Sequence, residues 1–147
     1  MPIRIGIASA SSIAKHGSKR FIHYLETIEE QGWDSLWFSD RIVGNAWTMD
    51  PLSGMAIAIS KTKRLKVGTG ILLMSMRSPV TSARALSTID QISEGRIAAI
   101  GVGVGQEAML EYDAMGVNKY DRGKRLDDAI RLMRLLWSED DIEYLSE

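Results

Sequence analysis

The residues most suited to chemistry in this chain are glycines associated with two apolar runs. The runs cover 67–73 and 97–104, and their glycines are Gly68, Gly70, Gly101, Gly103 and Gly105. Neither run alternates apolar with polar residues, which is typical of parallel strands covered on both faces. Parallel α/β sheets bind ligands at the C-terminal ends of their strands, where glycine lets a ligand approach the backbone. The pattern predicts a ligand site at that edge of a parallel sheet.

The second glycine cluster also matches a dinucleotide-binding pattern. Residues 103–108, Gly-Val-Gly-Gln-Glu-Ala, fit G-x-G-x-x-A after an expected strand and before an expected helix. A complete Rossmann unit would add a strand that ends in an acidic residue about 20 positions further on. Residues 121–127 begin an expected helix instead. Dinucleotide binding is therefore the weaker alternative at these glycines.

Other kinds of site lack their characteristic residues. The chain has no cysteine, so disulfides and cysteine metal ligands are excluded. His16 and His23 are not spaced as metal ligands, and the sequence holds no His-Glu-x-x-His pattern. We therefore expect no metal site. Arg77, in the loop after the first apolar run, is a candidate for contact with an anionic substrate or phosphate.

Composition indicates one domain, over residues 1–147, with enough apolar sequence to build a core. Apolar residues make up 45% of the chain and the formal net charge is −1, so neither nucleic acid nor an anionic membrane is expected as a partner. No apolar run approaches the roughly 20 residues of a membrane span. Residues 8–10, Ala-Ser-Ala, resemble a signal-cleavage site, but the apolar segment before them is too short for a signal peptide. We expect a cytoplasmic protein.

A strand followed by a helix recurs about every 31 residues, with strands expected to begin near residues 3, 35, 66 and 97. A polar loop is expected over 9–17 and a short helix over 106–115. The longer helices expected from apolar periodicity cover 21–31, 51–60, 79–94 and 121–137. Four βα units in a row fit a doubly wound sheet or half of a (β/α)8 barrel. A complete barrel needs about 250 residues, so this chain would hold its first half.

Two of these helices carry explicit core predictions. The residues expected to face the core are Leu52, Met55, Ala56 and Ile59 in one helix, and Val80, Ala83, Leu86, Ile89 and Ile92 in the other. We also expect Asp90 and Arg96 to form an ion pair, because they flank the turn before the fourth strand.

Several segments, taken in order, resemble the N-terminal half of the bacterial-luciferase-like monooxygenase superfamily. They are GWDSLWFSDR at 32–41, TKRLKVGTGI at 62–71, RSPV at 77–80, TIDQISEGR at 88–96, GVGVG at 101–105 and the helix that begins RGKRLDD at 122 and ends at 137. The matches cover nearly the whole chain with the correct order and spacing. The resemblance implies a (β/α)8 barrel, FMN or coenzyme F420 as cofactor, and oxidoreductase or monooxygenase activity on a small organic substrate.

The resemblance also assigns site residues. Gly70 and Ile71 match a third-strand bulge that often holds a non-proline cis peptide behind the isoalloxazine ring. Asp40 and Arg41 match the catalytic end of the second strand, where many relatives have Asp-His or His-His. Arg41 replaces the histidine, which argues against imidazole acid–base chemistry, but an arginine would stabilise negative charge on a reduced flavin. The other cofactor-binding residues expected by position are Ala8, Thr69, Gly103 and Val104.

Each assigned residue also has a purely structural alternative. Gly70 and Ile71 fit a strand end that needs room, Asp40 fits a cap, and Arg41 fits a surface ion pair. The first and fourth strands would be open edges, so we expect a homo-oligomer or a C-terminal barrel half as partner. The competing class is a non-catalytic half-barrel that binds flavin or serves in oligomerisation.

Overall fold

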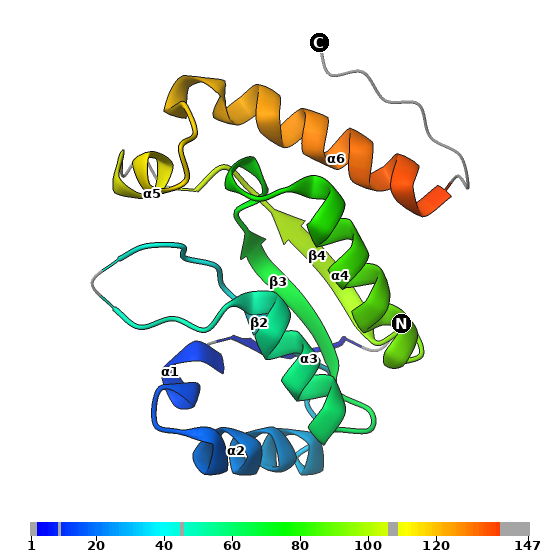
Figure 1. The fold of residues 1–147 in the computed structure, drawn as a ribbon. Coiled ribbons are helices and arrows are strands. Elements are labelled where there is room, and N and C mark those ends of the chain that lie inside the picture. The colour runs from blue at the N-terminus through cyan, green and yellow to red at the C-terminus, as the bar shows by residue number, and fades with distance from the viewer. Residues whose placement is uncertain (1–2, 9, 45, 106–108, 139–147) are drawn as a thin grey trace.

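A four-stranded parallel sheet forms the centre of the computed structural model, which describes residues 3–8, 10–44, 46–105 and 109–138 (Figure 1). The strands are β1 (Gly6–Ala8), β2 (Ser35–Phe38), β3 (Lys66–Leu72) and β4 (Ile97–Val102), and they lie in the order β1-β2-β3-β4. Every neighbouring pair is parallel. The expected α/β class, built from parallel βα repeats, is confirmed.

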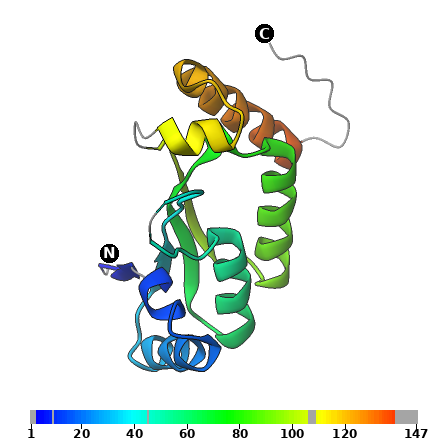
Figure 2. The ribbon, with the colours of Figure 1, turned by 60° about the vertical axis from the view of Figure 1, so that its left-hand side comes forward.

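The first four helices lie between consecutive strands, and the last two follow β4. They are α1 (Ala10–Ala14), α2 (Ser18–Glu30), α3 (Pro51–Lys61), α4 (Pro79–Ile92), α5 (Met109–Ala114) and α6 (Arg122–Ser138), with single 3-10 turns η1 (Met74–Met76) and η2 (Lys119–Asp121). Figure 2 shows α3 and α4 on the same side of the sheet. Each long helix begins and ends near the position that its apolar periodicity predicts.

One hydrophobic core lies between the sheet and these helices. Its members include Phe21, Leu25, Ile28, Leu36, Phe38, Met55, Ala58, Ile59, Val67, Leu72, Ala83, Leu86, Ile89, Ala129 and Met133. The opposite face is less covered: Ala98 and Ala99 of β4 are exposed, although their strand is entirely apolar. The prediction that both apolar runs are covered on both faces is therefore correct for most of β3 and wrong for β4, which lies at an open edge.

The N-terminal segment differs from its prediction in two ways. The strand begins at Gly6, not at Ile3, because β1 pairs with β2 only from Gly6 onward, and Ile3 and Ile5 are exposed. The expected polar loop contains α1, whose Ala10, Ser11 and Ala14 are buried. Small side chains let this short helix pack against the rest of the fold although it has no strong apolar stripe.

Some predicted core positions face water. Val80 and Ile92 are 51% and 70% exposed, whereas Ala83, Leu86 and Ile89 are buried as predicted. A strict spacing of three residues rotates by about 60° per step around a helix of 3.6 residues per turn. Five such positions therefore drift so far that the first and last leave the buried face. Ala56 is exposed because it lies about 100° around the helix from Met55.

The turn before β3 is held by side chains from two other segments. Arg96 donates to the Ile59 carbonyl at 2.6 Å, near the end of α3, where helical carbonyls lack partners. Its guanidinium forms no ion pair with Asp90, so that prediction is wrong. The Glu29 carboxylate accepts the backbone N–H groups of residues 63–65 at 2.6–3.0 Å. These contacts fix the edge of the sheet opposite the strands' C-terminal ends.

Candidate ligand cleft

A cleft of about 510 Å³ lies at the C-terminal ends of β2 and β3. Three segments form its walls: Ser39, Asp40, Arg41, Val43 and Gly44 after β2; Gly70, Ile71 and Leu73 of β3 and its loop; and Gly105, Leu110 and Glu111 around α5. The cleft lies at the sheet edge where the glycines predicted a ligand site.

The Gly70–Ile71 peptide forms one wall and is cis, as the resemblance implied. Both residues are exposed, and the side chain of Ile71 contributes an apolar surface. The Ile71 carbonyl accepts the Asp40 N–H at 3.0 Å, which joins the end of β3 to the residues just after β2. This wall therefore presents backbone and one aliphatic side chain to the cleft.

Two glycines of the second cluster make room for β3. A Cβ at Gly101 would lie 2.6 Å from the Thr69 carbonyl oxygen, and a Cβ at Gly103 would overlap the Ile71 side chain. Close packing against the β3 backbone therefore requires Gly101, whereas Gly103 leaves room for the end of the flexible Ile71 side chain; neither role needs a nucleotide. Residues 106–108, which complete the dinucleotide pattern, lie outside the described residues.

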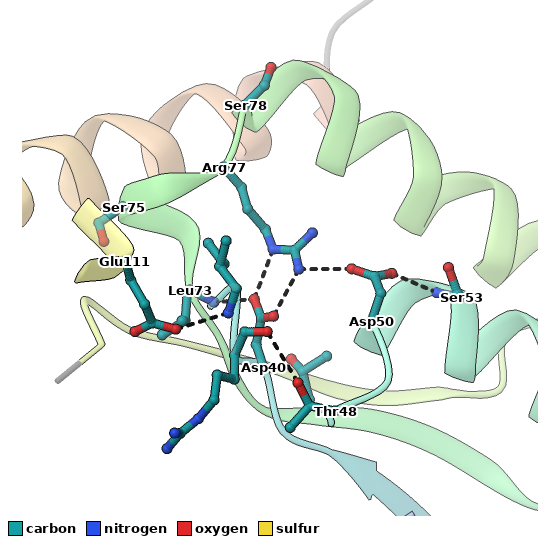
Figure 3. A network of polar contacts seen from close by, with 12 residues as sticks. Asp40, Thr48, Asp50, Ser53, Leu73, Ser75, Arg77, Ser78 and Glu111 are labelled. Atoms are coloured by element: carbon teal, nitrogen blue, oxygen red, sulfur yellow. Dashed lines mark hydrogen bonds and ion pairs between the residues drawn. The ribbon is translucent and has the colours of Figure 1, made fainter. Parts of the chain in front are cut away.

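Asp40 forms a buried ion pair with Arg77 (Figure 3). Arg77 Nε donates to Asp40 Oδ2 and Arg77 Nη2 donates to Asp40 Oδ1, both at 2.8 Å. The Leu73 N–H also donates to Oδ2, at 3.0 Å. The Asp40 side chain is 1% exposed and that of Arg77 is 20% exposed. Such a two-point pair is among the stronger charged hydrogen-bond arrangements.

The same guanidinium reaches the start of α3. Arg77 Nη2 donates to Asp50 Oδ2 at 2.8 Å, and Asp50 Oδ1 accepts the Ser53 N–H at 3.0 Å, which makes Asp50 the N-cap of α3 (Figure 3). Burial acts to raise the pKa of Asp50, but the Ser53 N–H and Arg77 lower it overall. Burial acts to lower the pKa of Arg77, but Asp40 and then Asp50 raise it overall.

Sequence reasoning missed Glu111, a 7% exposed residue of α5 that lines the cleft. Its Oε1 accepts the N–H of Ile42 at 2.9 Å and that of Val43 at 3.4 Å. The contact joins segments almost seventy residues apart, and one glutamate in a short helix gives no sequence signal for it. It fixes the chain immediately after Arg41.

Arg41 is the exposed cation of the cleft. Among the described residues no carboxylate lies within ion-pair distance of its guanidinium, so the expected surface ion pair is not formed there. Its carbonyl accepts the Thr48 hydroxyl at 3.3 Å. A Cβ at Gly44 would lie 2.8 Å from Arg41 Cδ, so the glycine makes room for the arginine stem.

The structure brings Asp40, Arg41, Gly70 and Ile71 together in the cleft. The other four predicted residues, Ala8, Thr69, Gly103 and Val104, do not line its described part. The buried Thr69 hydroxyl donates to the Gly101 carbonyl at 2.9 Å. The Val104 carbonyl accepts hydrogen bonds from Ser75 and Tyr112, and Ala8 ends β1.

Within the described residues, no group of three or more acidic or histidine side chains could hold a metal ion. Of the helices in the described ranges, none is both long and apolar enough to cross a membrane.

Fold and cleft together define a class of protein: a parallel βα scaffold with a cleft at the carboxyl ends of its strands. The chain belongs to the luciferase-like monooxygenase family, whose family model matches residues 3–147. This assignment agrees with the resemblance that the sequence motifs carried.

Relatives with described activities include enzymes that use coenzyme F420. The chain is 32% identical, over 91% of its length, to an F420-dependent glucose-6-phosphate dehydrogenase from Amycolatopsis mediterranei. It is 30% identical, over 67% of its length, to a 5,10-methylenetetrahydromethanopterin reductase from Methanolobus tindarius. The chain spans 42% of the first of these proteins and 28% of the second.

Solved structures show the same fold. The monooxygenase RslO1 from Streptomyces bottropensis superposes with a TM-score of 0.84 at 22% identity, over 99% of this chain and 46% of that one. An F420-dependent secondary alcohol dehydrogenase, solved with an F420-acetone adduct, gives a TM-score of 0.82 at 26% identity, over 100% of this chain and 46% of that one. The chain thus matches slightly less than half of each structure.

Proposed function

We propose that this chain is part of an FMN- or F420-dependent oxidoreductase that acts on a small organic substrate, and that the cleft receives the cofactor ring. The observation that carries the proposal is the cleft beside Gly70–Ile71 in a chain of this family. Its volume of about 510 Å³ lies within the usual range of small-molecule sites, about 300–1,000 Å³. When bound, either cofactor supplies hydride or electron transfer, which protein side chains do not supply themselves.

The cleft residues fit a flat, electron-accepting ring. Gly70 offers bare backbone and Ile71 an apolar surface, so together they would support one face of the ring. Arg41 would stabilise negative charge on the reduced ring, because its guanidinium is an exposed cation with several hydrogen-bond donors. We propose no imidazole acid–base step, because arginine stands at this position.

The remaining predicted residues would act more indirectly. The carboxylate of Asp40 already accepts three hydrogen bonds, so in our proposal it orients the residues beside the ring. Thr69 and Gly103 would shape the wall from behind, through their packing with β4 and Ile71. Ala8 and Val104 remain proposed cofactor contacts at the ends of β1 and β4.

We further propose that the working protein is a complete (β/α)8 barrel, formed with a C-terminal half or with a second copy of this chain, and that it acts in the cytoplasm. The exposed Ala98 and Ala99 of β4 support the need for a partner. Beside β4 lies a groove of about 490 Å³ of mixed polarity, lined by Ile97, Ile100 and Trp137 together with Ser87 and Asp90, which a partner could cover. The same open edge also favours the second candidate function, a non-catalytic half-barrel module.

Light scattering on the purified chain, with absorbance spectra before and after addition of FMN or F420, distinguishes these functions. The oxidoreductase proposal expects cofactor absorbance to move with the protein peak and the loaded protein to turn over a small organic substrate, whereas a flavin-binding module would carry the absorbance without turnover. A protein peak that stays colourless after incubation with each cofactor would favour the non-catalytic module.

A further inference from the structure

We propose that Arg77 is a positioning residue of the cleft: it holds in place both the segment that carries Arg41 and the end of β3 that carries Ile71. The claim that this affects a cofactor rests on the proposed function, whereas the claim that Arg77 orders the cleft walls does not. Arg77 does not line the cleft itself but lies behind its wall, so any effect on a ligand must pass through other residues.

The segment between β2 and α3 is held by Arg77 at both of its ends. Residues 41–49 contain no described helix or strand, yet their two flanking residues, Asp40 and Asp50, bind the same guanidinium. Arg77 Nη2 alone donates to both carboxylates, at 2.8 Å each. The two ends of an irregular segment are therefore tied to one point (Figure 3). Fixing both ends restricts the segment that carries Arg41.

Arg77 also acts on the end of β3, through Asp40. The pairing between β2 and β3 ends at Phe38 and Thr69, two residues before Ile71, which lines the cleft. Beyond it, Asp40 continues the connection: its N–H donates to the Ile71 carbonyl, and its carboxylate accepts the Leu73 N–H. Arg77 orients that carboxylate with two hydrogen bonds. The position of Ile71 relative to Arg41 thus depends on Arg77 through Asp40.

Only a guanidinium group can make all three of these contacts with the two carboxylates at once. Its planar array of donors satisfies both oxygens of Asp40 and one oxygen of Asp50 at once, which a lysine ammonium cannot do with the same geometry. Asp40 is 1% exposed, so water cannot readily replace a lost donor. Glu111 holds the neighbouring Ile42 and Val43 from the other side and provides no donor to Asp40.

The test compares Arg77→Lys and Arg77→Met with Arg84→Met. Arg84 is an exposed arginine on α4 that provides a matched control. The first readout is amide hydrogen exchange of the 147-residue chain, measured at Leu73, Ile42 and Val43 relative to core amides of α2. We expect exchange at these three amides to rise roughly tenfold or more in both Arg77 variants, beyond any change in α2, with no such rise in the control.

The second readout is the affinity for FMN and for F420, titrated under conditions where each variant keeps its native circular dichroism. We expect the dissociation constant to rise roughly tenfold or more for the Arg77 variants and to stay constant for Arg84→Met. Exchange that rises only in parallel with the α2 amides would mean that Arg77 merely stabilises the fold, and would overturn the proposal. Unchanged cofactor affinity, despite loosened cleft amides, would overturn the positioning of the ligand.

Two further outcomes are also decisive. If the unaltered chain binds neither cofactor, the proposed function fails, while the exchange comparison still decides whether Arg77 orders the cleft walls. If both Arg77 variants fail to fold, Asp50→Asn removes only one arm of the network. In Asp50→Asn we then expect faster amide exchange at Ile42 and Val43 than in the unaltered chain, and unchanged exchange at Leu73. If exchange changes equally at all three amides, or at none of them, the proposal is overturned.

Discussion

Substitution of Asp40 by asparagine tests the buried ion pair behind the cleft. The change keeps the shape of the side chain but removes its charge, and it replaces an acceptor oxygen with an amide donor. Arg77 Nε and Nη2 donate to the two carboxylate oxygens at 2.8 Å, and the Leu73 N–H donates at 3.0 Å. An asparagine can accept only part of this set, because one of its two polar atoms is a donor.

The magnitude follows from burial. Removing one partner of a buried pair costs about 3–5 kcal/mol of unfolding free energy. Arg77 keeps Asp50 as a partner and is 20% exposed, so solvent and the second carboxylate offset part of the loss. We therefore expect the lower end, about 3 kcal/mol. For a chain of this size that corresponds to a fall in Tm of about 6–12 °C.

Urea denaturation followed by circular dichroism measures this loss, with Asp127→Asn as the matched control. Asp127 is exposed on α6, so its substitution should change the unfolding free energy by no more than about 0.5 kcal/mol. A loss below about 1 kcal/mol for Asp40→Asn would refute the reasoning, because the pair would then contribute no more than a surface ion pair.

Two further predictions concern close packing and pH. In Gly101→Ala the new Cβ would lie 2.6 Å from a backbone carbonyl oxygen of β3, which cannot move alone. We therefore expect urea denaturation to show a loss of about 1–3 kcal/mol of unfolding free energy. Gly123→Ala is the control and should lose none, because no neighbouring atom lies within 4 Å of its Cβ. The opposite ranking of the two variants would contradict the packing account. The pKa values of Asp50 and Glu29 are lowered in the folded state. Their contribution to the free energy of unfolding is therefore complete above the unfolded-state pKa values, near 4, and is lost as the pH falls through the folded-state pKa values. The urea midpoint should therefore decrease as the pH is lowered from about 5 to about 3, and it should decrease less steeply in Glu29→Gln than in the unaltered chain. Equal slopes of midpoint against pH in the two proteins would exclude a contribution from Glu29.

The βα framework could be predicted because its signals are local. Unbroken apolar runs, the Asp50-Pro51 helix start and the glycine at 95 each act within a few residues of the element that they define. The errors came from elements without such signals. Residues 10–14 form a helix from small residues whose burial depends on neighbouring elements, and the exposure of β4 depends on what lies beyond the sheet edge.

The candidate site was only partly predictable for a related reason. The resemblance identified Asp40, Arg41, Gly70 and Ile71, which line the cleft, but no spacing rule links Asp40 to Arg77 across 37 positions. Arg77 was a candidate for an anionic ligand, whereas the fold places it against two carboxylates of its own chain. Glu111 reaches the cleft only because α5 packs beside the segment after β2. Such contacts depend on three-dimensional proximity, which the local sequence does not encode.

The most direct test of the proposed function is a paired titration of the unaltered chain and of Gly70→Val with FMN and with F420. Gly70 lines the cleft, and the nearest atom to a Cβ placed there is 3.7 Å away, on Trp37, so the fold has room for a Cβ at this position. Gly123→Val, on the surface of α6, is the matched control. We expect the unaltered chain and the control to bind one of the two cofactors and Gly70→Val, with native circular dichroism, to bind neither. Equal cofactor affinity of Gly70→Val and the unaltered chain would overturn the proposed function.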